Sequence, residues 1–145
     1  MDELSTELKK VLADTFAFYL KAHNFHWNVE GPNFVQLHDF FGDLYTDAFG
    51  AVDLIAEHIR TLNSYAPGSF SRFKDLTSIQ DEVNIPGAMS MVVKLNDDNN
   101  KVISILTSAM KIADKTGKAN ISNFLQDRID THEKHGWMLR AISKA

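Results

Sequence analysis

Apolar residues recur every three or four positions along most of the chain, which is the spacing of one face of an α-helix. The first amphipathic segment begins near Asp2 or Ser5, either of which is suited to cap a helix, and runs to about Trp27. It must end before Gly31 and Pro32, because a proline disfavours helical conformation in the residue that precedes it. The pattern therefore predicts one long N-terminal helix.

The second amphipathic segment follows Asn33, a residue type that favours the N-cap position. It continues without a break until Pro67 and Gly68, which interrupt helices. Its apolar positions are Phe34, Leu37, Phe41, Leu44, Tyr45, Ala48, Val52, Ile55, Ala56, Ile59 and Leu62. About eight turns of uninterrupted helix are therefore expected.

The rest of the chain contains a long connection and two further helical segments. Residues 69–85 have a mixed pattern that indicates one short helix inside the connection. Long helices are predicted over about 89–113 and about 120–142. The run NDDNN at 96–100 has low helix propensity and is the weakest part of the third long helix.

Four long amphipathic helices predict an all-α four-helix bundle formed by one domain over residues 1–145. The turn between the first two helices is short, so these helices should be antiparallel neighbours. The connection over 63–86 is long enough to cross from one end of the bundle to the other. One long crossover carrying a short helix is typical of the ferritin-like topology.

Composition excludes several classes of protein. The chain has no cysteine, no apolar run of the roughly 18–20 residues that a membrane span needs, and a polar, acidic start. A cytoplasmic protein without signal peptide, membrane span or disulfide is expected. The net charge of −4 argues against a general nucleic-acid binder.

Three histidines surround the first turn. His23 and His26 are three residues apart and share one helix face, and His38 lies about one turn into the next helix. Because the two helices are antiparallel, His26 and His38 should lie near each other. Imidazoles alone do not complete a site for iron, so carboxylate ligands are expected as well.

Asp53 and Glu57 are the candidate carboxylates, four residues apart on one face of the second helix. Asp53 is fifteen residues from His38, which is roughly 22 Å along a helix, whereas metal–ligand bonds are only about 2 Å long. One chain therefore cannot hold one ion with both pairs. Either the pairs are unrelated, or they meet across a two-fold axis that gives two sites per dimer.

Each feature has a simpler explanation when it is taken alone. Histidines on helices are most often surface or satisfied core residues, as expected here for His58, His132 and His135. Glu57 has a potential ion-pair partner in Arg60, and Trp27 could simply fill the core. The Glu-x-x-His ligand pattern of bundles that hold a di-iron site within one chain is absent from the sequence.

The combined spacing of His26-Trp27, His38, Asp53 and Glu57 resembles the Dps family of mini-ferritins. The stretch PGSFSRFKDLTSI at 67–79 is similar to the linker helix of that family, and a tryptophan in the last helix has a counterpart there. The resemblance implies a hollow dodecamer of four-helix subunits built from two-fold dimers. It also implies a ferroxidase, an oxidoreductase that oxidises Fe(II) with hydrogen peroxide in preference to O2, stores ferric mineral and limits oxidative stress.

Carried over residue by residue, the resemblance makes His26 and His38 of one subunit and Asp53 and Glu57 of its neighbour the metal ligands. Trp27 would lie beside the site and intercept oxidising equivalents. Two positions depart from the family pattern, because Gly42 stands where many members have an acid and His23 where many have a basic residue such as lysine. We hypothesise that His23 turns inward over Gly42 and supplies the missing ligand, which would soften the site and favour Zn(II) alongside Fe(II).

Two further features bear on alternative functions. Neither end has the lysine-rich tail on which DNA binding in this family often depends, so weak or absent DNA binding is expected. The pores through which iron enters are usually lined by aspartates on the last helix. The corresponding stretch of this chain contains Lys118, Asn123 and Gln126, with Asp127 and Asp130 as nearby acids. The alternatives to a ferroxidase are a zinc- or iron-binding shell with weak turnover and a DNA-compacting structural protein.

Overall fold

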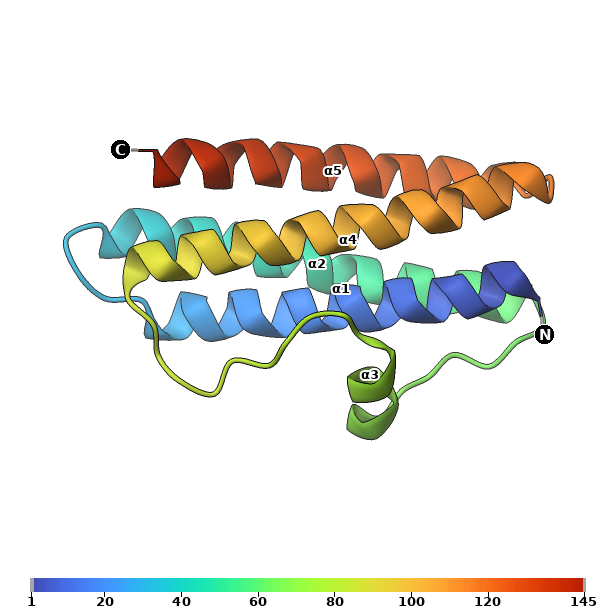
Figure 1. Cartoon of the computed structure of the whole chain (residues 1–145), viewed down its shortest axis with the longest axis horizontal. Coiled ribbons are helices and arrows are strands. Elements are labelled where there is room, and N and C mark those ends of the chain that lie inside the picture. The colour runs from blue at the N-terminus through green and yellow to red at the C-terminus, as the bar shows by residue number, and fades with distance from the viewer. Residues whose placement is uncertain (1, 145) are drawn as a thin grey trace.

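Four long helices lie side by side along one axis in the computed structural model, which describes residues 2–144 (Figure 1). They are α1 (Glu3–Asn28), α2 (Phe34–Thr61), α4 (Ala88–Lys115) and α5 (Ala119–Ser143), and the short α3 (Phe70–Leu76) lies beside them. The crossover between α2 and α4 returns the chain along the length of the bundle, so that α4 runs in the same direction as α2. This arrangement confirms the predicted ferritin-like bundle.

The helix ends follow the local sequence signals. The Asp2 side chain caps α1 by accepting a hydrogen bond from the Leu4 N–H at 3.1 Å, so Asp2 rather than Ser5 is the N-cap. Asn33 is at the N-cap of α2 as expected, but its side chain makes no capping hydrogen bond. Gly117 has a φ of 74°, a left-handed conformation that glycine adopts without strain and that ends α4.

The NDDNN run is helical throughout, within α4. Two of its polar side chains are buried and have partners on neighbouring helices. Asp98 accepts a hydrogen bond from the Lys21 Nζ of α1 at 2.7 Å, and the Asn99 amide donates to the His132 carbonyl oxygen of α5 at 2.8 Å. These tertiary contacts outweigh the low helix propensity of the run.

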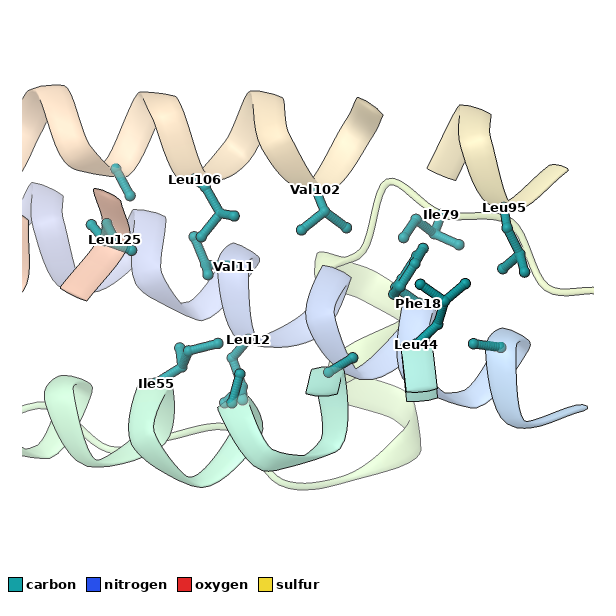
Figure 2. Packing of buried hydrophobic residues seen from close by; sticks show 14 of the residues in the cluster. Val11, Leu12, Phe18, Leu44, Ile55, Ile79, Leu95, Val102, Leu106 and Leu125 are labelled. Atoms are coloured by element: carbon teal, nitrogen blue, oxygen red, sulfur yellow. The ribbon is translucent and has the colours of Figure 1, made fainter. Parts of the chain in front are cut away.

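The core runs the length of the bundle and draws on all four long helices (Figure 2). It also includes Ile79 of the crossover, which is 6% exposed. Labelled core residues are Val11, Leu12, Phe18, Leu44, Ile55, Ile79, Leu95, Val102, Leu106 and Leu125. Because Ile79 packs into this core, the crossover is part of the folded unit.

The crossover is also fastened by polar contacts. The buried Asp14 carboxylate of α1 accepts hydrogen bonds from the Thr77 hydroxyl and the Ser78 N–H, both at 2.7 Å, and from the Ser78 hydroxyl at 3.0 Å. Farther along, Lys94 of α4 forms an ion pair with Glu82 at 2.6 Å. These contacts hold the connection against α1 and α4.

A buried polar network joins α2, α4 and α5. Arg128 donates two hydrogen bonds to the Asp47 carboxylate, at 3.0 and 2.8 Å, and a third to the Nε2 of His132 at 3.1 Å. His132 is fully buried, and its Nδ1 donates to the Asn99 Oδ1 at 2.7 Å. His135 donates from Nε2 to the Asp47 Oδ2 at 3.0 Å. Both histidines therefore have structural partners.

Among the described residues, no helix combines the length and the apolar character needed to cross a membrane.

Candidate metal centre

His26 and His38 meet at the end of the bundle where α1 turns into α2. Their rings stack with centroids 3.8 Å apart and planes 18° apart. Both residues are only partly buried, so the pair is partly accessible from outside the bundle. The structure therefore brings together the two histidines that the antiparallel turn was expected to join.

Two reciprocal hydrogen bonds fix these rings. The Nδ1 of His26 donates to the carbonyl oxygen of His38 at 2.6 Å, and the Nδ1 of His38 donates to the carbonyl oxygen of His26 at 2.7 Å. A carbonyl oxygen only accepts, so each Nδ1 must carry a hydrogen, and each neutral ring keeps its lone pair on Nε2. Histidines that bind metals commonly donate the other ring N–H to such an oxygen. The pair therefore fits metal ligation through Nε2.

Gly42 lies directly against the His26 ring. A Cβ atom added at Gly42 would lie 3.2 Å from the His26 Nδ1 and 3.3 Å from its Cε1, closer than ordinary van der Waals contact. The imidazole nearest Gly42 is therefore that of His26 rather than His23, because the hydrogen bond to the His38 carbonyl draws His26 into that space. Ligation of a metal by His23 stays a prediction.

His23 instead lies in an aromatic stack one turn before His26. Its ring is parallel to that of Tyr45, with centroids 3.8 Å apart and planes 5° apart, and it lies 3.9 Å from Trp27. Its Nδ1 is hydrogen-bonded to the Tyr19 hydroxyl at 3.0 Å. Burial and, to a lesser extent, the nearby His26 lower the pKa of His23, which favours a neutral imidazole that can bind a metal.

Asp53 and Glu57 lie on an exposed part of α2, away from the histidines. Since α2 is unbroken from Phe34 to Thr61, the separation of roughly 22 Å between His38 and Asp53 holds. Within residues 2–144, no group of three or more histidine, aspartate or glutamate side chains is gathered closely enough to hold a metal ion. One chain therefore provides the two halves of the candidate site at different places.

The alternative partner for Glu57 is engaged elsewhere. Arg60 donates to the Ser64 carbonyl oxygen at 3.1 Å and lies 4.8 Å from the centre of the Tyr65 ring. No ion pair joins Arg60 to Glu57 in the described part of the chain. The Glu57 carboxylate is therefore exposed and available to a ligand from outside the chain.

Three features of this region were left open or missed in the sequence analysis. Trp27 is 59% exposed and does not fill the core. Phe49 and Leu54, which flank Asp53 along α2, are 57% and 49% exposed, giving this helix an apolar outer face next to the carboxylates. Tyr19 contacts His23, and their four-residue spacing on α1 was the available signal for that contact.

The positions expected near the iron pores are all exposed around the start of α5: Lys118, Asn123, Gln126, Asp127 and Asp130. Exposure alone does not show that these residues line a pore between subunits, so the pore assignment stays a prediction.

The protein-family model for Ferritin, described as a ferritin-like domain, matches residues 5–145 of this chain. A DNA protection during starvation protein of Bacillus anthracis is 34% identical over 135 residues, which cover 93% of this chain and 92% of that protein. The crystal structure of a Dps protein from Bacillus brevis has a TM-score of 0.93 at 31% identity, covering 97% of this chain and 95% of that one.

A Dps protein from Vibrio cholerae, described as a member of a broad superfamily of ferritin-like diiron-carboxylate proteins, has a TM-score of 0.94 at 30% identity. The alignment covers 98% of this chain and 89% of that one. Fold and sequence agree, and the chain belongs to the ferritin-like family as a Dps mini-ferritin.

Proposed function

We propose that this protein is a ferroxidase and iron store, which oxidises Fe(II) with hydrogen peroxide and keeps the ferric product as mineral inside a hollow dodecamer. The observation that carries the proposal is the stacked pair of His26 and His38. Their reciprocal Nδ1 hydrogen bonds leave the two Nε2 lone pairs free, and both side chains are only partly buried. Imidazole nitrogens held in this way suit Fe(II) when carboxylates complete the site.

The carboxylates come from a second subunit in this proposal. If two copies of α2 pack antiparallel about a two-fold axis, His38 of one subunit faces Asp53 and Glu57 of the other, and each dimer has two equivalent sites. The exposed apolar face at Phe49 and Leu54 supports such a contact, because it would otherwise be in water. Glu57 forms no ion pair or side-chain hydrogen bond within residues 2–144, which supports the contact as well.

Each group has a distinct task in the reaction. The imidazoles of His26 and His38 hold Fe(II), the substrate, while Asp53 and Glu57 supply the anionic oxygen ligands that favour the more highly charged ferric product. Two Fe(II) ions each give up one electron, and one hydrogen peroxide molecule takes up both electrons and two protons to form two water molecules. Trp27, exposed beside the histidines, is placed to intercept oxidising equivalents that escape this reaction.

His23 is proposed as an additional ligand in place of the acid that is missing at Gly42. Its Nδ1 is hydrogen-bonded to the Tyr19 hydroxyl, and its Nε2 is the position proposed for a metal. A centre with three imidazoles would bind Zn(II) as well as Fe(II). A zinc- or iron-binding shell with weak turnover is therefore the second candidate function.

Protection of DNA by this protein is proposed to act through removal of iron and peroxide in the cytoplasm. With a net charge of −4 over these 145 residues, each subunit has little to neutralise DNA phosphates. A DNA-compacting structural role is therefore the less favoured interpretation.

The test is anaerobic loading of the assembled, metal-free protein with Fe(II), followed by a peroxide pulse in a stopped-flow spectrometer. The wild type should give rapid ferric absorbance, with about two Fe(II) consumed per peroxide, whereas His26→Ala and His38→Ala should lose the fast phase. A wild type no faster than buffer would contradict the ferroxidase and favour the metal-binding shell.

A further inference from the structure

Tyr19 and His23 are four residues apart on the same face of α1. A 3.0 Å hydrogen bond joins the Tyr19 hydroxyl to the His23 Nδ1. The His23 ring also lies against Tyr45 and Trp27, which fix its plane. These ring contacts alone would still allow the imidazole to flip by about 180° about its Cβ–Cγ bond, which keeps the plane but exchanges the positions of its nitrogen and carbon atoms. The hydrogen bond to Tyr19 decides which nitrogen faces α1, and so directs Nε2 away from Tyr19.

The Tyr19 hydroxyl differs in kind from the partners of the other two histidines. The backbone carbonyls next to His26 and His38 only accept, so those rings are restricted to one neutral form. A hydroxyl both donates and accepts. When Tyr19 accepts from the Nδ1 of His23, the lone pair is on Nε2, and when Tyr19 donates, the hydrogen is on Nε2. Rotation of the hydroxyl thus allows either form without movement of the ring.

We propose that Tyr19 is a positioning residue of the metal centre, whose hydroxyl holds His23 with Nε2 directed to a divalent cation and accepts the Nδ1 hydrogen when that cation binds. The inference rests on the proposed function, because it requires a cation at His26 and His38. It assigns to Tyr19 a role that acts only through His23.

Removal of the hydroxyl should therefore weaken metal binding without disturbing the bundle. Tyr19→Phe keeps the ring that packs against Phe49 and Phe16, with centroids 4.9 and 5.6 Å away, but leaves the His23 Nδ1 without its partner. Loss of a hydrogen-bond partner of this kind typically lowers metal affinity about 10–100-fold. In a chain that already lacks the His23 imidazole, the same change should have almost no effect.

The experiment is a titration of the assembled, metal-free protein with Co(II), whose visible absorption reports its ligand set, followed by competition with Zn(II). The proteins compared are the wild type, Tyr19→Phe, His23→Ala, the double variant and one control. Tyr65→Phe is the matched control, because Tyr65 is 82% exposed on the crossover and makes its ring contact with Arg60. Circular dichroism and the mass of the assembly establish that each variant is folded.

We expect Tyr19→Phe to bind Co(II) about 10–100-fold more weakly with an altered spectrum, Tyr65→Phe to match the wild type, and the double variant to match His23→Ala. Tyr19→Phe with wild-type affinity, or with an equal loss in both backgrounds, would overturn the role of Tyr19 while leaving the histidine–carboxylate centre intact. If His23→Ala bound as tightly as the wild type, His23 would not be a ligand and the inference would fail with it. A wild type that bound no Co(II) would instead contradict the proposed function itself.

Discussion

Acidification from pH 7.5 to pH 5 should destabilise the bundle through His132. This side chain is fully buried, its Nδ1 donates to Asn99, and its Nε2 accepts from Arg128. A second ring proton would have to replace the Arg128 hydrogen bond and lie next to the guanidinium charge. Burial, followed by the positive charge of Arg128, therefore lowers the pKa of His132 to about 3.

The direction of the effect follows from proton uptake. In the unfolded chain His132 has its ordinary pKa of about 6.5. Below that pH the unfolded state binds a proton at His132, whereas the folded state does not. Stability is therefore complete above about pH 7 and falls as the pH decreases from 6.5 toward 3. Since pH 5 is about 1.5 units below the unfolded pKa, and each unit corresponds to about 1.4 kcal/mol, the loss is roughly 2 kcal/mol per chain.

Another group of the same network acts in a different pH range. Hydrogen bonds from His135 and Arg128 outweigh desolvation and lower the pKa of Asp47 well below its usual value. The stability contributed by Asp47 is lost only as the pH falls below about 4, where the unfolded carboxylate takes up a proton. The decline between pH 6.5 and pH 4 therefore belongs to histidines.

Urea denaturation at several pH values and one protein concentration measures this decline, with constant concentration because assembly contributes to stability. His132→Gln keeps a donor and an acceptor but does not titrate, so its stability should depend less on pH than that of the wild type. His58→Gln is the control, because burial also lowers the pKa of His58 but this residue is only partly buried and belongs to no buried hydrogen-bond network of the described residues. A wild type equally stable at pH 5 and 7.5, or a His132→Gln variant with the wild-type slope, would refute the reasoning.

Three further predictions concern the crossover, the α1–α4 contact and DNA. Asp14→Ala should lower the free energy of unfolding by about 2–3 kcal/mol and expose residues 63–86 to protease, because charge-assisted bonds to the crossover are lost; urea midpoints and limited proteolysis measure both effects. Lys21→Met should cost about 3–5 kcal/mol by leaving the Asp98 charge buried and unpaired, while Lys21→Met with Asp98→Leu should recover most of that loss in the same assay. At about 150 mM salt the assembled protein should not retard plasmid DNA in a gel, and clear retardation would contradict the electrostatic argument.

The helices could be predicted from the sequence because periodicity, proline and glycine are local signals. The breaks at Pro32 and Gly117 are where the structure has them. Local signals were less informative for residues 96–100, since the stability of that stretch depends on Lys21 and His132, which are distant in sequence. The sequence alone does not show which distant residues will contact this stretch, because those contacts depend on how the helices pack.

The candidate site was predictable only in part, because local sequence signals define the helices and the turn but not the side-chain conformations. The short antiparallel turn was enough to bring His26 and His38 together. It could not indicate which imidazole would occupy the space over Gly42, because that depends on the side-chain conformation selected by the hydrogen bond from His26 to the His38 carbonyl oxygen. The joining of these histidines with Asp53 and Glu57 requires a second chain and stays a prediction.

Mixed assembly of two inactive variants tests the shared centre most directly. One chain carries His26→Ala and His38→Ala, and the other carries Asp53→Asn and Glu57→Gln. A shared site is intact only where the histidines come from the second chain and the carboxylates from the first, which random pairing produces at about one site in four. Each variant alone should lack fast peroxide-dependent iron oxidation. The account predicts that a co-assembled equal mixture recovers about a quarter of the wild-type amplitude, and an amplitude no greater than that of either variant alone would contradict it.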